Sequence, residues 1–161
     1  MPAGELVEER QIRVLEALFT RYVHCIDDDD LERWPDFFLD DGLYQIISRE
    51  SHEAGHRIGV MLCRGRGMMI DRVRAMRQAN IFEPQRYTHI LGRPEVVAAE
   101  GAFRARPNFH VVRTMEDGQS DMFATGKYVD SVVMVGEHPR FRERKVVLDS
   151  RRIDTLLVVP L

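Results

Sequence analysis

Five residues spread along the chain have side chains suited to acid–base chemistry in an apolar pocket. They are Tyr22, Asp27, Trp34, His89 and His110. A carboxylate or an imidazole can act as a general base, while a phenol and an indole can line a pocket. The alternative is that the histidines make hydrogen bonds in the core and the aromatic rings fill it. We favour this alternative, and keep the five residues as the predicted pocket lining if the chain is an enzyme.

The segment from His52 to His56, HEAGH, matches the zinc-protease pattern H-E-x-x-H. That pattern binds zinc because two histidines one helical turn apart share a helix face, with the glutamate as base. Gly55 disfavours a helix here, and no third ligand stands at a spacing typical of such enzymes. We therefore predict no metal site in this segment.

Two further clusters also have structural explanations. His24 and Cys25 are neighbours, but consecutive residues of a helix do not face each other, so Cys25 is expected to be a buried apolar residue. The run Asp27–Asp30 lacks the EF-hand pattern and is expected to end one helix and cap the next. The sequence has neither the cysteine and histidine pairs of a Rieske cluster nor a glycine-rich phosphate loop. We expect no catalytic, metal-binding or cofactor-binding residue in this chain.

The composition is that of an ordinary globular protein. The chain has 161 residues, of which 44% are hydrophobic and 30% charged, and its net charge is −3. This length suits one domain, residues 1–161, with a core of its own. A slightly acidic chain is not expected to bind nucleic acid or anionic membranes, since both require a basic surface. No apolar run could span a membrane and no secretory signal is visible, so we expect a cytoplasmic protein.

Hydrophobic periodicity predicts helices in the first half of the chain and strands in the second. Helices are expected at 5–26, from Asp30 as N-cap to Leu39, and at 68–78. Strands are expected at 43–49, 89–100, 103–115, 120–135, 141–149 and 153–159, turns at 40–42, 116–119 and 136–139, and irregular segments at 50–67 and 80–88. This order indicates an α+β fold, in which N-terminal helices pack on a strongly curved, cone-like antiparallel sheet.

The segment Ile153–Val159 is apolar on both faces of a strand, which is typical of a strand covered on both sides. The polar corner Asp149–Arg152 separates it from the preceding strand, Arg144–Leu148. We expect these two strands to pair, and the residues up to Leu161 to pack into a sheet or against another subunit.

Segments spread over nearly the whole chain carry a family resemblance. They are Tyr22–Phe38 (YVHCIDDDDLERWPDFF), Tyr44, Ile47–Glu50 (ISRE), Met69–Val73 (MIDRV), Ala79–Glu83 (ANIFE), His89–Gly92 (HILG) and Asp149–Leu161 (DSRRIDTLLVVPL). In this order they resemble the small (beta) subunit of aromatic-ring-hydroxylating dioxygenases. Within that family the chain is most similar to members of the anthranilate, ortho-halobenzoate, terephthalate and salicylate type.

The resemblance implies a cone-shaped fold similar to nuclear transport factor 2 (NTF2-like) and ketosteroid isomerase. It also implies an α3β3 hexamer, in which a large (alpha) subunit holds a Rieske 2Fe-2S cluster, a mononuclear iron and the substrate pocket. The small subunit would associate as a trimer, hold no cofactor and be structural. Large side chains are expected at its interfaces. The candidates are Trp34, Arg72, Arg142, Arg144 and Arg151.

Three functions therefore compete. The first, favoured by the resemblance, is a structural subunit of a ring-hydroxylating oxygenase that degrades aromatic compounds such as benzoate-type acids. The second is a stand-alone cone-fold isomerase or dehydratase with an Asp or His base. The third is a self-associating binding domain.

Overall fold

The structure, a computed structural model, describes residues 7–79, 83–151 and 159–161. Its helices are α1 (Glu9–Asp27), the 3-10 helix η1 (Leu31–Phe37), α2 (Arg49–Glu53) and α3 (Arg66–Ala79). Its strands are β1 (Phe38–Ser48), β2 (Met61–Arg64), β3 (Gln85–Leu91), β4 (Glu95–Ala99), β5 (Ala102–Arg106), β6 (Asn108–Met115), β7 (Ser120–Val135) and β8 (His138–Leu148). The predicted α+β class is confirmed. The predicted strand 153–159 lies outside the described residues except for Val159, which is in a bend.

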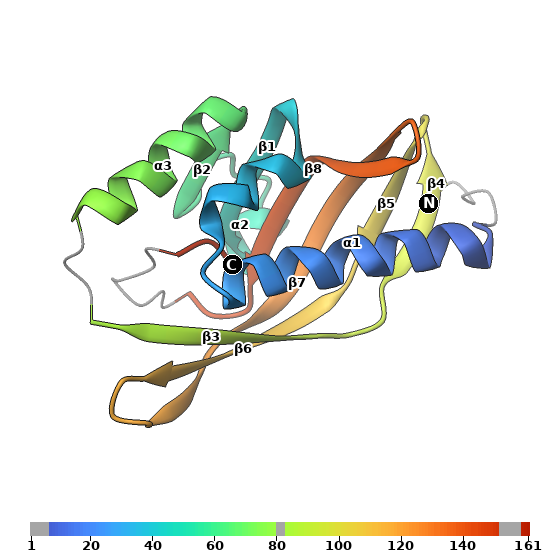
Figure 1. Cartoon of the computed structure of the whole chain (residues 1–161). Coiled ribbons are helices and arrows are strands. Elements are labelled where there is room, and N and C mark those ends of the chain that lie inside the picture. Colours follow the sequence, from blue (N-terminus) through green and yellow to red (C-terminus); the bar gives the residue numbers. More distant parts are fainter. Residues whose placement is uncertain (1–6, 80–82, 152–158) are drawn as a thin grey trace.

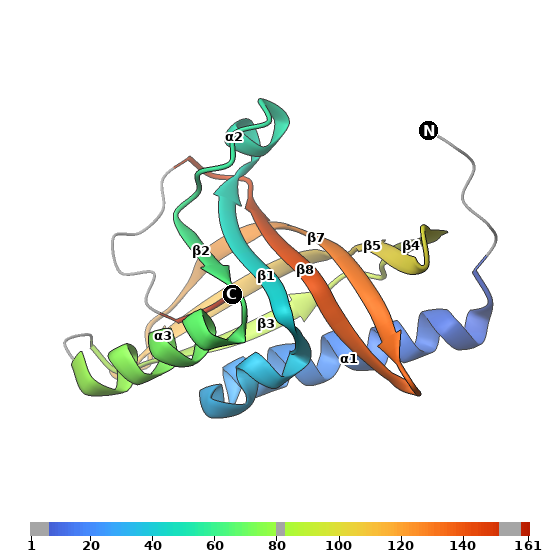
Figure 2. The same cartoon turned by 90° about the horizontal axis from the view of Figure 1, so that it is seen from above.

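The strands form one curved sheet that divides into two arms. The order is β2-β1-β8-β7-β5-β4, with β6 also paired to β7 and β3 paired to β6. The second half of β7 pairs with β5 and its first half with β6, so the division occurs along β7. The β3–β6 arm curls round beside α1 (Figure 1), while β1, β8 and β7 run side by side in the other arm (Figure 2). The result is the predicted cone-like sheet.

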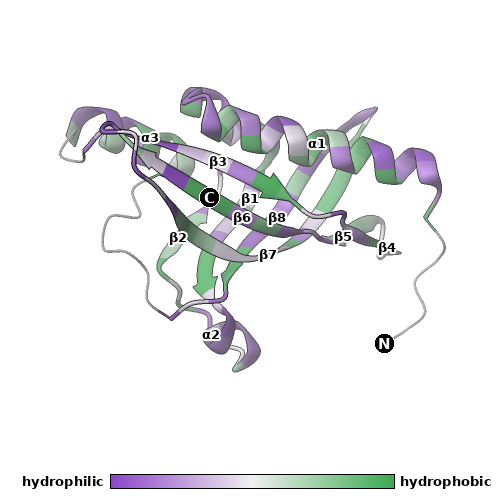
Figure 3. Ribbon diagram, turned by 90° about the horizontal axis from the view of Figure 1, so that it is seen from below, coloured by the Kyte–Doolittle hydropathy of each residue, from purple (hydrophilic) through white to green (hydrophobic). Residues whose placement is uncertain are grey.

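Helix α1 covers the concave side of the sheet with its apolar face. The residues at helical spacing along that face are buried: Leu15, Leu18, Phe19, Tyr22, Val23, Cys25 and Ile26. A capping box between Glu8 and Gln11 begins the helix. Figure 3 shows hydrophobic residues of β8 and β1 under the helices, and hydrophilic residues on the outer side of α1. The core therefore lies between the helices and the sheet, inside the cone.

The predicted turn at Asp40-Asp41-Gly42 does not reverse the chain. It lies inside β1, where the pairing with β8 jumps from Phe38–Phe141 to Leu43–Glu143. An aspartate pair and a glycine disfavour regular pairing, and here they produce an irregularity instead of a hairpin. The β1–β8 pairing is also parallel, which corrects the prediction of a purely antiparallel sheet.

Two predicted long strands are each broken into two. Segment 89–100 becomes β3 and β4, separated at Pro94, and segment 103–115 becomes β5 and β6, separated at Pro107. Proline has no N–H to donate to a strand partner, so the pairing stops there and the chain changes direction. These breaks allow the sheet to divide into its two arms.

The segments expected to be irregular contain regular elements. Segment 50–67 holds most of α2 and all of β2, in which Met61 and Cys63 face the core. Helix α3, which covers the predicted helix 68–78, buries Met69, Val73 and Met76. The second helix is a 3-10 helix, and the side chain of Asp30 makes no capping hydrogen bond to it. In the described part of the chain, no helix is long and apolar enough to cross a membrane.

Candidate functional site

A buried ion pair lies at the centre of the cone. Asp130 on β7 and Arg144 on β8 are direct partners in the antiparallel register. Arg144 Nε donates to Asp130 Oδ1 at 2.9 Å and Nη2 donates to Oδ2 at 2.6 Å. Both side chains are 0% exposed. Burial raises the pKa of Asp130 above its ordinary value although Arg144 lowers it. Burial opposes the charged form of Arg144, but Asp130 raises its pKa overall, so the guanidinium stays charged.

Aromatic rings surround the guanidinium group of Arg144. Its carbon lies 3.9 Å from the ring centre of Tyr128, 4.2 Å from that of Tyr22 and 4.2 Å from that of Phe141. Ring faces attract a cation, so these contacts offset part of the cost of burying it. Arg144 Nη1 and Tyr128 Oη have no hydrogen-bond partner within the described part of the chain. The guanidinium group of Arg144 is therefore surrounded by aromatic rings and the carboxylate of Asp130.

A second polar network joins α1, η1 and β1. Trp34 Nε1 donates to Tyr22 Oη at 3.0 Å, and Tyr22 Oη donates to the backbone oxygen of Leu161 at 3.0 Å. Tyr44 Oη accepts from the backbone N–H of Leu161 at 2.8 Å and donates to its backbone oxygen at 3.1 Å. Tyr22, Trp34, Tyr44 and Leu161 are all 0% exposed. Burial raises the pKa of Tyr22 to about 12 and raises that of Tyr44 as well. Both phenols are therefore neutral near pH 7.

The remaining three predicted pocket residues are divided between two places. Asp27, at the end of α1, accepts the backbone N–H of His89 at 2.9 Å and lies 2.6 Å from His89 Nδ1. This pair ties the edge strand β3 to α1, and the His89 side chain is fully buried. His110 is exposed on β6, next to the inward-facing Phe109. The structure thus brings Tyr22 and Trp34 together and Asp27 and His89 together, but leaves His110 outside the cone.

Two of the five predicted interface residues are inside the chain. Trp34 and Arg144 are 0% exposed, so their side chains cannot contact another subunit, and the prediction is wrong for them. Both side chains are large and carry polar groups, and the sequence alone does not reveal the buried partners of those groups. Arg142 and Arg151 are exposed, and Arg151 Nε lies 2.6 Å from Glu50 Oε2. Arg72 is half-buried on α3.

The H-E-x-x-H segment does not form a zinc-protease helix. Helix α2 ends at Glu53, and Gly55 follows with φ of +73°, so His52 and His56 do not share a helix face. Across residues 7–79, 83–151 and 159–161, no group of three His, Cys, Asp or Glu side chains could hold a metal ion.

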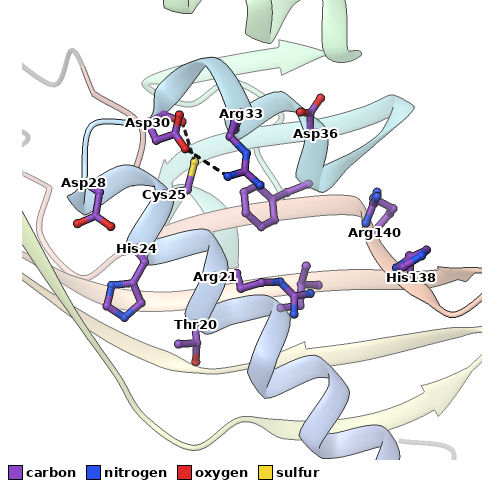
Figure 4. A pocket seen from close by; sticks show the side chains of 12 residues that line it. Thr20, Arg21, His24, Cys25, Asp28, Asp30, Arg33, Asp36, His138 and Arg140 are labelled. Carbon is purple, nitrogen blue, oxygen red and sulfur yellow. Dashed lines mark hydrogen bonds and ion pairs between the residues drawn. The ribbon is translucent and has the colours of Figure 1, made fainter.

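An open hollow of about 540 Å3 lies outside the cone, between α1, η1 and the start of β8 (Figure 4). Polar side chains rim it, with arginines, aspartates and two histidines among them: Arg21, His24, Asp28, Asp30, Arg33, Asp36, His138 and Arg140. Cys25 lies at its floor and its thiol donates to the backbone oxygen of Asp30 at 3.0 Å. Burial, followed by the charge of Asp30, raises the pKa of Cys25 to about 12, so the thiol stays protonated and is not a nucleophile.

Sequence reasoning missed Asp130, Tyr44 and Tyr128 as parts of the interior. One signal was available for Asp130. In β7 the residues Tyr128, Asp130 and Val132 alternate on one buried face, and a carboxylate at a core-facing position implies a buried partner. The partner itself could not be inferred, because it depends on which strand pairs with β7.

The two carboxylates of the interior described above are both bound to partners within the chain. Asp130 is bound to Arg144, the phenols of Tyr22 and Tyr44 are bound to Leu161, and Asp27 is bound to His89. A general base needs an acceptor open to a substrate. This arrangement does not favour the isomerase or dehydratase alternative.

Comparisons with known proteins agree with this geometry. The small subunit of anthranilate 1,2-dioxygenase from Burkholderia cepacia is 36% identical over 145 residues, which are 89% of this chain and 90% of that protein. Beta subunit 2 of the terminal oxygenase component of terephthalate 1,2-dioxygenase from a Comamonas species is 36% identical over 97% of this chain and 100% of its own length.

A solved structure is also similar over nearly the whole chain. It is the beta subunit assigned to an aromatic-ring-hydroxylating dioxygenase from Novosphingobium aromaticivorans, with a TM-score of 0.86 and 36% identity over 96% of this chain and 100% of that one. Residues 21–155 match the family described as ring hydroxylating beta subunit. The chain is therefore a member of the ring-hydroxylating dioxygenase beta-subunit family.

Proposed function

We propose that this protein is the structural small subunit of a Rieske non-haem iron oxygenase that acts on a benzoate-type aromatic acid. The observation that carries the proposal is that both carboxylates described inside the cone are bound to partners within the chain. Asp130 is bound to Arg144 and Asp27 to His89, so we infer that the chain supplies shape and contact area while redox chemistry takes place elsewhere. The Rieske 2Fe-2S cluster, the mononuclear iron and the substrate pocket are assigned to a large alpha subunit.

The assembly that we propose is an α3β3 hexamer in the cytoplasm, with the whole chain, residues 1–161, acting as one domain. Relatives named as small subunits of anthranilate and terephthalate dioxygenases support a multi-component enzyme and an aromatic acid as substrate. Exposed arginines suit such interfaces because the guanidinium group binds carboxylates in a fixed geometry. Arg142, at an irregularity of β8, and the half-buried Arg72 and exposed Arg151 remain the interface candidates.

Co-expression with the large subunit from the same gene neighbourhood tests the proposal. We expect a complex with the mass of three copies of each subunit, and oxygen uptake with anthranilate, terephthalate or another benzoate derivative. The isolated small subunit should show no such activity and should contain no stoichiometric iron. Turnover of an aromatic acid by the small subunit alone would refute the proposal.

Point variants then locate the interfaces. Arg142→Ala and Arg151→Ala should weaken assembly without changing the thermal unfolding of the isolated chain. Arg13→Ala is the matched control, because Arg13 is an exposed arginine on α1 that pairs with Glu9 of the same helix. If size-exclusion chromatography with light scattering gives the same hexamer mass for both test variants at every protein concentration, the two arginines are not interface anchors.

A further inference from the structure

The backbone N–H and backbone oxygen of one residue inside the cone, Leu161, are bound as a ligand would be. Tyr22 Oη and Tyr44 Oη both donate to the backbone oxygen of Leu161, at 3.0 Å and 3.1 Å. Tyr44 Oη also accepts the backbone N–H of Leu161 at 2.8 Å. Trp34 Nε1 supplies the donor for the remaining acceptor position of Tyr22 at 3.0 Å. Each hydroxyl therefore uses its single proton and accepts one hydrogen bond.

The three side chains that form this site come from different elements. Tyr22 lies on α1, Trp34 on η1 and Tyr44 on β1. They meet only when the helices are packed on the sheet, so the site is a property of the folded cone. Tyr44 and Trp34 also support each other, because their rings pack edge to face with centres 4.9 Å apart.

The side chain of Leu161 is equally enclosed. Leu161 is 0% exposed and belongs to the main hydrophobic cluster, Pro160 is buried and Val159 packs partly against the same cluster. A buried site of this kind selects a branched apolar side chain and one neighbouring peptide N–H and oxygen. It rejects a charged side chain, because a charge without a partner is costly in an apolar interior.

We propose that the interior of the cone is a preformed binding site for a short apolar peptide, filled in this protein by its own residues 159–161. When those residues are removed, the site binds the same Val-Pro-Leu sequence supplied as a separate peptide. Its ligand class is a peptide with a leucine-like residue that offers one N–H and one oxygen acceptor to the two phenols. This site is distinct from the interfaces proposed above and does not depend on them.

The test uses a variant that ends at residue 158 and the peptide acetyl-Val-Pro-Leu. Trp34 is the only tryptophan of the chain and takes part in the site, so its fluorescence reports binding directly. We expect saturable binding by fluorescence and calorimetry, and a rise in melting temperature with peptide concentration. Acetyl-Val-Pro-Asp should not bind at the same concentrations. Equal binding of the two peptides, or binding of neither by the folded variant, would overturn the proposal.

A second variant distinguishes specific binding at this site from non-specific stabilisation by the peptide. Adding Tyr44→Phe to the shortened chain removes the hydroxyl that contacts both backbone groups of Leu161, and should weaken peptide binding by about tenfold or more. Unchanged affinity would contradict the assignment. If the shortened chain is unfolded alone, acetyl-Val-Pro-Leu should restore its circular dichroism and Trp34 fluorescence in a saturable way. Absence of that recovery at millimolar peptide would also refute the site.

Discussion

Removal of one partner of the Arg144–Asp130 pair should be among the most damaging single changes in the chain. Arg144→Met keeps a long, unbranched side chain in the aromatic surroundings but leaves the Asp130 carboxylate without its two hydrogen bonds. Breaking a fully buried pair on one side costs about 3–5 kcal/mol. Small proteins are stable by only about 5–15 kcal/mol, so the variant should lose a large part of its free energy of unfolding.

The double variant Arg144→Met with Asp130→Leu should recover most of that loss. It removes both charges, so no buried group is left unpaired, and such replacements are often neutral or stabilising. Urea denaturation at pH 7, followed by Trp34 fluorescence and circular dichroism, measures all three proteins. Arg142→Met is the control, because Arg142 is exposed on the same strand, and its effect should stay within about 0.5 kcal/mol.

The loss in Arg144→Met should also depend on pH in a defined direction. Burial already raises the pKa of Asp130 in the folded protein, and removal of the guanidinium raises it further. A raised folded-state pKa gives stability that is full below the unfolded-state pKa and is lost as pH rises through the folded-state pKa. The variant should therefore lose stability from about pH 4 upward. A loss below about 1 kcal/mol at pH 7, or a double variant as unstable as the single one, would refute this account.

Three further predictions concern other parts of the fold. Gly126→Ala should lower the free energy of unfolding by about 3 kcal/mol, because the added Cβ would lie 2.1 Å from a backbone oxygen of β8. Gly67→Ala is the control: open space surrounds Gly67, so its free energy of unfolding should change by less than about 1 kcal/mol. Stability should fall as pH rises from about 10 to 12, because burial raises the pKa of Tyr22 from an ordinary 10.0 to about 12 in the folded protein. In urea titrations, the Tyr22→Phe variant should lose less stability over this pH range. Arg77→Ala should lower stability by about 1 kcal/mol or less, and less in 1 M salt, because its bonds to Glu32 and Asp29 tie α3 to η1 and to the turn before it at the surface. Arg74→Ala is the control, because Arg74 forms an ion pair with Asp71 of the same helix.

The sequence predicted best the elements whose residues interact locally. Helix α1 follows from apolar residues at helical spacing, and β7 was predicted with its observed ends, Ser120 and Val135, because turn residues bound an alternating run. Local sequence signals predicted the structure less well in segments whose conformation depends on strand pairing. The Asp40–Gly42 turn signal became an irregularity inside β1, because Phe38 and Leu43 both pair with β8.

The interior could not be predicted, because its contacts join residues far apart in the chain. Tyr44 and Leu161 are 117 positions apart, and no periodicity relates them. The parallel β1–β8 pairing places Tyr44 beside Arg144 in register, which brings the two polar networks to the same region. A chain that contains many arginines gives no local sign that Arg144, among the residues that the structure describes, is fully buried.

The two networks share Tyr22, which makes their coupling measurable. The ring of Tyr22 lies under the Arg144 guanidinium, and its hydroxyl donates to Leu161. Arg144→Met would let this ring move and weaken its bond to Leu161. Leu161→Ala should therefore lower the free energy of unfolding less in the Arg144→Met variant than in the unmodified protein. A double-mutant cycle should therefore show a coupling of about 0.5–3 kcal/mol between the two positions, whereas Arg144→Met and Gly67→Ala should be additive. Additivity of Arg144→Met with Leu161→Ala would mean that the ion pair and the Leu161 site stabilise the cone independently.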